Sequence, residues 1–324
     1  MSSLEKTDPS TVASIPSPAV SPVPPGSLRA TRHTGFSLSR IRAIASNTLL
    51  ELIRLKVFYF MMLFALVIIG SSIFMVKFSF QEQFQVLKDV SLGAMSIFTW
   101  LLAVLSTAML LPKDIEDRTL YTILAKPVPR FEYLLGKLIG VLLMLAIALT
   151  LMGVVFAAIL YSRQQTVLAE TYAAFPPGKE LDAAVHAIKS STFDLNLLPG
   201  IALIYVKAAI CAALTLLIST FASSSIFTIM VSIMVYLIGH VQPIARDYWL
   251  AQMPGGQEPS AILKVFVGFV ALIFPDFQLF NLVDDVVVGN VIPMGMFLKT
   301  AGLGLSYIAV YTLVAYAFFA NKEL

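Results

Sequence analysis

Residues 111–137 read LPKDIEDRTLYTILAKPVPRFEYLLGK and join two apolar runs, residues 93–111 and 138–161. The connection holds nine charged residues, whereas each flanking run is long enough to cross a membrane. A run of about 20 apolar residues spans a hydrocarbon core of about 30 Å as a helix, because a helix satisfies its own backbone hydrogen bonds in lipid. This order of apolar run, charged connection and apolar run predicts a helical membrane protein.

The composition of the whole chain indicates the same class. Of the 324 residues, 58% are hydrophobic and 13% are charged, compared with about 45–50% and about 25% in soluble domains. We therefore predict an all-α, polytopic membrane protein. Its six expected spans are residues 57–78, 93–111, 138–161, 200–221, 226–241 and 301–320.

A further apolar stretch, residues 261–274 (AILKVFVGFVALIF), is short for a span. It carries Lys264 and runs directly into Pro275 and Asp276, and its length suits a re-entrant or interfacial helix. We predict that residues 261–285 form a re-entrant segment on the outer side, before the last span. A true seventh span would instead move the C-terminus to the outer side.

Lysine and arginine residues near the ends of the spans predict the orientation of the chain. They are denser on the side of residues 111–137 than on the opposite side. We therefore expect a multi-pass protein of the cytoplasmic (inner) cell membrane with both termini in the cytoplasm. Residues 1–37 are rich in proline and serine and have no apolar core, which predicts a disordered cytoplasmic tail rather than a signal peptide.

Residues 38–56 have the pattern of an amphipathic helix. Leu50 is an exception to the pattern, and the residues on the apolar face are Ile41, Ile44, Ala45, Thr48, Leu49, Leu52 and Leu55. Such a stripe beside a span predicts a helix that lies in the membrane interface. The alternative is a cytoplasmic extension of the first span.

Few residues in the sequence have the chemistry to hold a metal or a nucleotide. Cys211 is the only cysteine, and His33, His186 and His240 lie on different segments, so we expect no disulfide and no metal site. The sequence has no G-x-x-x-x-G-K-[ST] loop, so a partner would have to bind any ATP that is used. We expect no enzymatic activity, no cofactor bound by this chain and no nucleic-acid partner.

The charged connection has the features of a docking surface. Pro112 is expected to end the preceding helix, Pro127 and Pro129 to bend the chain, and Gly136 and Gly140 to let a neighbouring helix approach closely. Charges flank a short apolar stripe that comprises Leu120, Tyr121, Ile123 and Leu124. Because apolar area supplies contact and charges supply orientation, we interpret the connection as a stiff cytoplasmic docking surface. The alternative is an ordinary solvated loop.

The same residues resemble a known family. Residues 114–137 resemble the segment after the second span of ABC-2 type transporter permeases, and the matching positions are Glu116, Arg118, Thr119, residues 124–128 (LAKPV), Arg130, Gly136 and Lys137. Residues 214–240 resemble the family's tight turn between the fourth and fifth spans, and residues 274–290 resemble its outer segment before the last span. The resemblance covers residues 38–324, and the outer loop 162–199 and the N-terminal tail depart from it.

This resemblance implies a permease subunit that pairs with a second copy or with a related permease. Each permease would rest on a separate cytoplasmic ABC ATPase subunit, which binds ATP and Mg²⁺, and the complex would export its cargo. Residues 38–56 would be the elbow helix of the family. The implied ATPase-coupling residues are Asp114, Glu116, Asp117, Arg118, Thr119, Leu120, Tyr121, Leu124 and Arg130.

One alternative is a membrane-embedded transferase, which would use clustered acidic residues to hold Mg²⁺ against a diphosphate. Asp114, Glu116 and Asp117 form one acidic cluster, and Asp284 and Asp285 form another. The expected topology places the two clusters on opposite sides of the membrane, so they would not share a metal ion.

A second alternative is a secondary transporter or channel that works without ATP. Such proteins place ionisable residues near the middle of the bilayer. The predicted spans contain Lys207, with His240 near an outer end, and no acidic residue, which disfavours proton coupling. Lys207 lies about seven residues, or roughly 10 Å, from the outer start of its predicted span. Its side chain is expected to snorkel to the interface or, alternatively, to contact anionic cargo. The cargo itself, whether lipid, peptide, antibiotic or polysaccharide, stays open.

Overall fold

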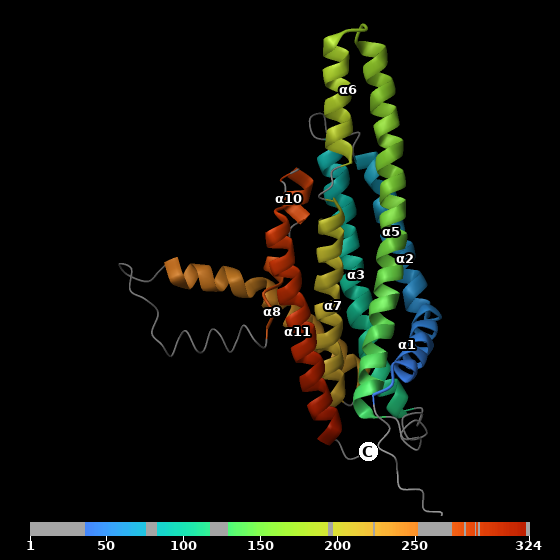
Figure 1. The fold of residues 1–324 in the computed structure, drawn as a ribbon, viewed down its shortest axis with the longest axis vertical. Coiled ribbons are helices and arrows are strands. Elements are labelled where there is room, and N and C mark those ends of the chain that lie inside the picture. The colour runs from blue at the N-terminus through green and yellow to red at the C-terminus, as the bar shows by residue number, and fades with distance from the viewer. Residues whose placement is uncertain are drawn as a thin grey trace, which may run out of the picture. The chain divides into compact units, whose positions relative to one another are not determined.

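Long helices account for the regular structure in the described part of the chain (Figure 1). The structure is a computed structural model that describes residues 36–75, 83–116, 129–193, 197–222, 224–251, 274–281, 283–288, 290 and 292–321. The elements are α1 (Leu38–Ile53), α2 (Lys56–Met75), α3 (Gln83–Glu116), α5 (Arg130–Ala174), α6 (Lys179–Thr192), α7 (Leu197–Phe221), α8 (Ser225–Ala251), the 3-10 helix η3 (Phe277–Phe280), α10 (Val283–Val288) and α11 (Met294–Asn321). Among these residues six helices are long and apolar enough to cross a membrane, so the prediction of an all-α polytopic protein with six spans is confirmed.

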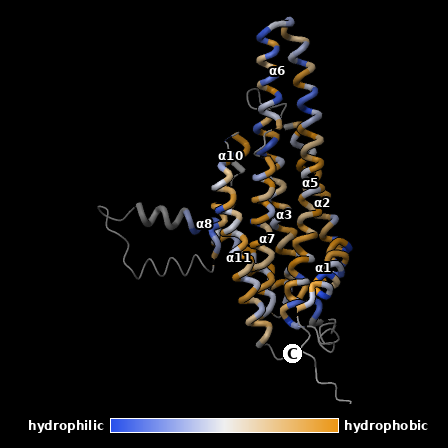
Figure 2. Tube along the Cα trace, in the orientation of Figure 1, coloured by the Kyte–Doolittle hydropathy of each residue, from blue (hydrophilic) through white to orange (hydrophobic). Residues whose placement is uncertain are grey.

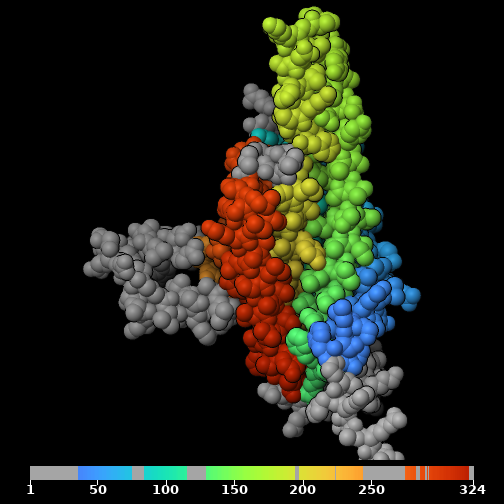
Figure 3. All heavy atoms as spheres, viewed as in Figure 1, coloured from blue at the N-terminus to red at the C-terminus, as the bar shows by residue number. Residues whose placement is uncertain are grey.

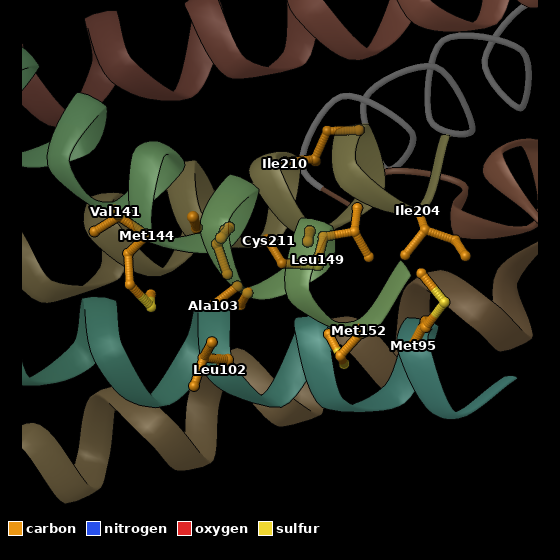
Figure 4. Close-up of a cluster of buried hydrophobic side chains, with 14 of the residues drawn as sticks. Met95, Leu102, Ala103, Val141, Met144, Leu149, Met152, Ile204, Ile210 and Cys211 are labelled. Atoms are coloured by element: carbon orange, nitrogen blue, oxygen red, sulfur yellow. The ribbon is translucent and has the colours of Figure 1, made fainter. Parts of the chain in front are cut away.

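The centre of the bundle lies where α3, α5 and α7 meet. Figure 4 shows Leu102 and Ala103 of α3, Met144 and Met152 of α5, and Cys211 of α7 gathered in one buried cluster. Small residues on α7 make this approach close, since Ala208, Ala209, Ala212 and Ala213 are all buried. In lipid such packing rests on van der Waals contact, because lipid tails are as apolar as the side chains themselves.

Large apolar side chains also cover the outside of the bundle. Phe60, Leu63 and Val67 of α2 and Met230 and Met234 of α8 are each more than half exposed. A soluble protein rarely exposes apolar surface on this scale, whereas a membrane-crossing helix directs such side chains to lipid. Figure 2 shows the apolar character of the central part of the bundle.

Helices α5 and α6 form a hairpin that extends beyond the apolar part of the bundle (Figures 1 and 2). The 45 residues of α5 correspond to a length of about 68 Å, more than twice the thickness of a hydrocarbon core of about 30 Å. The amino group of Lys88 on α3 donates a 2.8 Å hydrogen bond to the carbonyl of Ser191 in the last turn of α6, where carbonyls lack helical partners. Residues 162–199, predicted as an outer loop, are largely helical. The prediction missed this because hydropathy marks where a helix is apolar and not where it ends.

Helix α1 is separate from α2 and packs against α5 (Figure 3). Arg54 and Leu55 form a turn between the two helices, so α1 is not a continuous extension of the first span. The side chains that α1 buries are Ile41, Ala45, Thr48 and Leu52. They belong to the apolar face expected from the sequence, but here that face covers another helix of the same chain. The position of α1 in the membrane interface stays a prediction.

Gly136 and Gly140 lie where α5 meets α1. A Cβ atom on Gly136 would lie 2.8 Å from the Cβ of Ile44, and one on Gly140 would lie 2.6 Å from the Cβ of Thr48 and 2.9 Å from the carbonyl oxygen of Ala45. Non-bonded carbon atoms attract best at about 3.5–4.0 Å, so a methyl group does not fit. The absence of side chains at these two positions sets the distance between the helices.

Several helix ends differ from the predicted ones. Pro112 does not end its helix, because α3 continues through Pro112 to Glu116. Helix α7 begins at Leu197, before the predicted start of the span at residue 200. Pro199 falls in its first turn, where proline is tolerated. The predicted re-entrant helix 261–274 and the tail 1–37 lie almost wholly outside the described residues.

We predict that Gly140→Ala destabilises the protein by about 1–3 kcal/mol, the usual cost of overpacking a well-packed core. The reason is that the new methyl group would meet the backbone of α1, which yields less readily than a side chain. The free energy of unfolding in mixed detergent micelles measures the effect. Gly70→Ala is the matched control, because no atom lies within 4 Å of the Cβ position at Gly70; equal effects of the two substitutions would contradict the close approach.

Candidate functional site

A cluster of charged residues joins the two helices that flank the charged connection. We call Glu51, Lys113, Asp114, Tyr133 and Lys137 the ion cluster. Lys137 Nζ lies 2.7 Å from Asp114 Oδ2 and 3.7 Å from Glu51 Oε2, and Lys113 Nζ lies 2.7 Å from Glu51 Oε1. The hydroxyl of Tyr133 donates to Asp114. The cluster therefore ties α1, α3 and α5 together at one end of the bundle.

The centre of the ion cluster is shielded from solvent. The side chains of Lys137 and Asp114 are 5% and 11% exposed, whereas that of Lys113 is 46% exposed. The ammonium group of Lys137 also lies 5.8 Å from the centre of the Tyr133 ring, within the range of a cation–π contact. A buried charge that loses its partner is costly, so the Lys137–Asp114 pair holds the end of α3 against the start of α5.

Glu51 links the buried and exposed parts of the ion cluster. Burial alone would favour its neutral form, but the hydrogen bond from Lys113 and the positive charge of Lys137 outweigh burial and lower the pKa of Glu51 below its usual value. Glu51 is therefore ionised at neutral pH and is bound by one lysine from each neighbouring helix.

Two residues in the first turn of α5, Glu132 and Arg130, make further contacts with neighbouring parts of the chain. Arg40 of α1 donates to both carboxylate oxygens of Glu132, from Nε at 2.6 Å and from Nη2 at 2.9 Å, a bidentate geometry that fixes orientation as well as distance. The backbone N–H of Ser37 donates to the same carboxylate at 2.9 Å. Arg130 Nη1 donates to the carbonyls of Phe319 and Ala320 at 3.0 and 2.6 Å, and so caps the C-terminal end of α11.

The predicted coupling residues divide into two groups. Asp114 lies in the ion cluster and Arg130 caps α11, whereas Glu116 lies in the last turn of α3. The other predicted residues, Asp117, Arg118, Thr119, Leu120, Tyr121 and Leu124, lie outside the described part of the chain.

Sequence reasoning missed the partners of these groups. Arg40 and Glu51 fall outside the apolar face predicted for residues 38–56, and the structure places their side chains against Glu132 and Lys137 of α5. The available signal was charge complementarity. The base Arg40 and the acid Glu51 precede the first span, and the acid Glu132 and the base Lys137 precede the third. Asp114, which the transferase alternative would use for Mg²⁺, pairs with Lys137 and accepts a hydrogen bond from Tyr133 in the described part of the chain.

A second polar group lies inside the bundle around Lys207 of α7. Its side chain is buried, and the prediction that it snorkels to the surface is wrong. Lys207 Nζ lies 3.2 Å from His240 Nε2 and 5.6 Å from the centre of the Tyr236 ring, both on α8. Trp100 of α3 stacks on Tyr236, with the two ring centres 4.0 Å apart.

The chemistry of His240 follows from its two neighbours. Its Nδ1 lies 3.2 Å from the carbonyl oxygen of Tyr236. A carbonyl only accepts, so Nδ1 carries a proton, and Nε2 is left to accept a hydrogen bond from Lys207. This assigns a neutral imidazole that accepts from the amino group of Lys207. Among the described residues no carboxylate forms an ion pair with Lys207.

A further ionisable residue lies near His240. Asp276, predicted to lie in an outer segment, is buried and interacts electrostatically with His240. The Lys207 group therefore combines an amine, an imidazole and a nearby acid.

Comparison of the sequence with protein-family models and with curated proteins found no match. The resemblance of residues 114–137 to ABC-2 type permeases stays a prediction that these comparisons do not test.

We predict that Lys137→Met destabilises the protein by about 3–5 kcal/mol, because it leaves the buried carboxylate of Asp114 without its ammonium partner. The free energy of unfolding in mixed micelles measures the loss. Adding Asp114→Leu to Lys137→Met should recover much of the lost stability, since the double variant buries no unpaired charge at these positions.

Lys113→Ala is the control for this experiment, because an exposed pair contributes about 0–1 kcal/mol. If Lys137→Met cost no more than Lys113→Ala, the ion cluster would be solvated and would not hold the two helices together.

Proposed function

We propose that this chain is the permease subunit of an ATP-driven ABC-2 type exporter. It works as a dimer with a second copy or a related permease, and residues 113–131 couple it to a separate cytoplasmic ATPase. The chain lies in the cytoplasmic membrane with both termini inside. The motif resemblance supplies the family, and the ion cluster supplies the physical support.

The observation that carries this proposal is the buried contact between Lys137 and Asp114. A coupling segment transmits a displacement only if both of its ends are fixed to the helices that it moves. Asp114 lies near the start of the charged connection and Lys137 lies at its end. Asp114 Oδ2 and Lys137 Nζ are 2.7 Å apart. A force on the connection therefore acts on α3 and α5 as one body.

The displacement would extend beyond these two helices. Arg40 joins α1 to the first turn of α5, and Arg130 joins the end of α11 to the same turn. Closure of two ATPase subunits on ATP would thus move four helices together and switch the packed bundle between two discrete arrangements. The chain itself would contribute binding and positioning, and the chemistry of ATP hydrolysis would take place in the partner.

The distribution of positive charge supports the proposed orientation. Seven described basic residues lie at the end of the bundle that carries the connection, namely Arg40, Arg42, Arg54, Lys56, Lys113, Arg130 and Lys137, compared with Lys88, Arg163, Lys179, Lys189 and Lys299 at the opposite end. An excess of lysine and arginine in short segments beside spans marks the cytoplasmic side.

We predict that Glu116→Ala combined with Arg118→Ala leaves membrane insertion intact and lowers the affinity for the ATPase about tenfold or more, because charged residues at an interface centre often contribute above 1.4 kcal/mol each. Co-purification of the ATPase subunit with tagged permease measures binding, and reconstituted vesicles measure ATP hydrolysis.

The matched control is Lys179→Ala combined with Glu180→Ala, which removes an exposed base and acid from the α5–α6 hairpin. Equal recovery of the ATPase by the wild type and by the connection variant would exclude this segment as the coupler.

The Lys207 group favours ATP-independent, ion-coupled transport as a second candidate function. Intramembrane ionisable residues mark ion and proton pathways, and the buried Asp276 supplies an acid that the predicted spans lack. In vesicles that contain the chain alone, this candidate predicts that an imposed pH gradient dissipates faster than in empty vesicles and that Lys207→Met removes the difference. A gradient that decays equally in both would eliminate it.

A further inference from the structure

A groove of about 500 Å³ opens between the C-terminal half of α1 and the end of α3. Its lining comprises Asn47, Leu50, Glu51, Arg54, Leu55 and Lys113. Neither the membrane crossing of the chain nor the proposed coupling to an ATPase requires this groove.

The groove lies at the ends of two membrane-crossing stretches. The crossing stretch of α2 begins at Lys56, next to Leu55, and that of α3 ends at Asp114, next to Lys113. Chain that flanks such stretches lies at the depth of the lipid headgroups. This placement holds whichever end of the bundle faces the cytoplasm.

The polar residues of the groove are suited to a phosphate. Arg54 and Lys113 are exposed, and both side chains are strong phosphate donors. Glu51 does not oppose an anion as a free carboxylate would, because it is bound by Lys113 at 2.7 Å and by Lys137 at 3.7 Å. The amide of Asn47 adds a neutral hydrogen-bonding group.

The apolar residues of the groove are suited to the part of a lipid next to its phosphate. Leu50 departs from the apolar face of α1 and is 53% exposed, and Leu55 is half-buried beside it. A soluble anion gains nothing from two leucines, whereas a glycerophospholipid presents acyl chains directly below its phosphate.

We propose that this groove binds the headgroup of an anionic phospholipid, with its phosphate between Arg54 and Lys113 and the start of its acyl chains against Leu50. Basic pockets between membrane helices recognise acidic headgroups in this way. The bound lipid would bridge α1 and α3 next to the exposed part of the ion cluster. The inference does not rest on the proposed transport function, although the groove shares Glu51 and Lys113 with the ion cluster.

Native mass spectrometry of the purified full-length chain tests the proposal, with delipidated protein titrated with phosphatidylglycerol or phosphatidylcholine. We expect phosphatidylglycerol to bind more tightly, and Arg54→Gln combined with Lys113→Gln to lower its affinity about tenfold or more, since each basic residue near an anionic headgroup contributes about a factor of five. Lys179→Gln combined with Lys189→Gln, in the α5–α6 hairpin, is the control with equal loss of charge. Equal binding of the two lipids, or unchanged binding by the groove variant, would overturn the proposal.

Two further measurements separate a lipid from a soluble anion and do not depend on the folding of the double variant. Inorganic phosphate and glycerol phosphate should fail to displace phosphatidylglycerol at equal concentration; displacement by either would assign the groove to a soluble anion instead. A photoreactive residue at Leu50, in an otherwise unchanged chain, should label phosphatidylglycerol in vesicles of mixed composition. Labelling in proportion to the bulk lipid would show no specific site.

Discussion

The described structure depends on the charge pair between Lys137 and Asp114, placed at the edge of a bundle with few other polar contacts. Both side chains are largely removed from solvent, where an ammonium group or a carboxylate alone would be costly. The pair therefore ties the depth of α3 to that of α5. The hydrophobic effect does not set that depth, because lipid tails are as apolar as the side chains themselves.

The remaining polar contacts at this end reinforce the same register. Glu132 holds α1, Arg130 holds α11, and Gly140 lets α1 approach α5 so closely that Arg40 and Glu51 reach their partners. These contacts are short, directional and confined to one end of the bundle. At the opposite end, Lys88 joins α3 to the base of the α5–α6 hairpin. The described bundle thus has one end where charges fix the helices and a central part that is held by apolar packing.

Sequence patterns predicted the number of membrane-crossing helices, because hydropathy responds directly to burial in lipid. They did not predict the first two turns of α5, since Arg130, Glu132 and Lys137 count as solvent-exposed in any hydropathy profile. Their burial follows from partners on three other helices, which no local window contains. The same limit explains Lys207, whose neighbours Tyr236 and His240 come from another helix, α8. The spacing of Gly136 and Gly140 predicted a close helix contact but carried no information about which helix would make it.

The uninterrupted course of α5 has a mechanical consequence. One rigid rod of 45 residues starts at the ion cluster, crosses the bundle and ends in the polar hairpin. A tilt of about 5° about its charged end would displace the far end of a rod of about 68 Å by about 6 Å. An angular change too small to break the bundle's packing would thus become a movement as wide as a helix turn on the opposite face of the membrane.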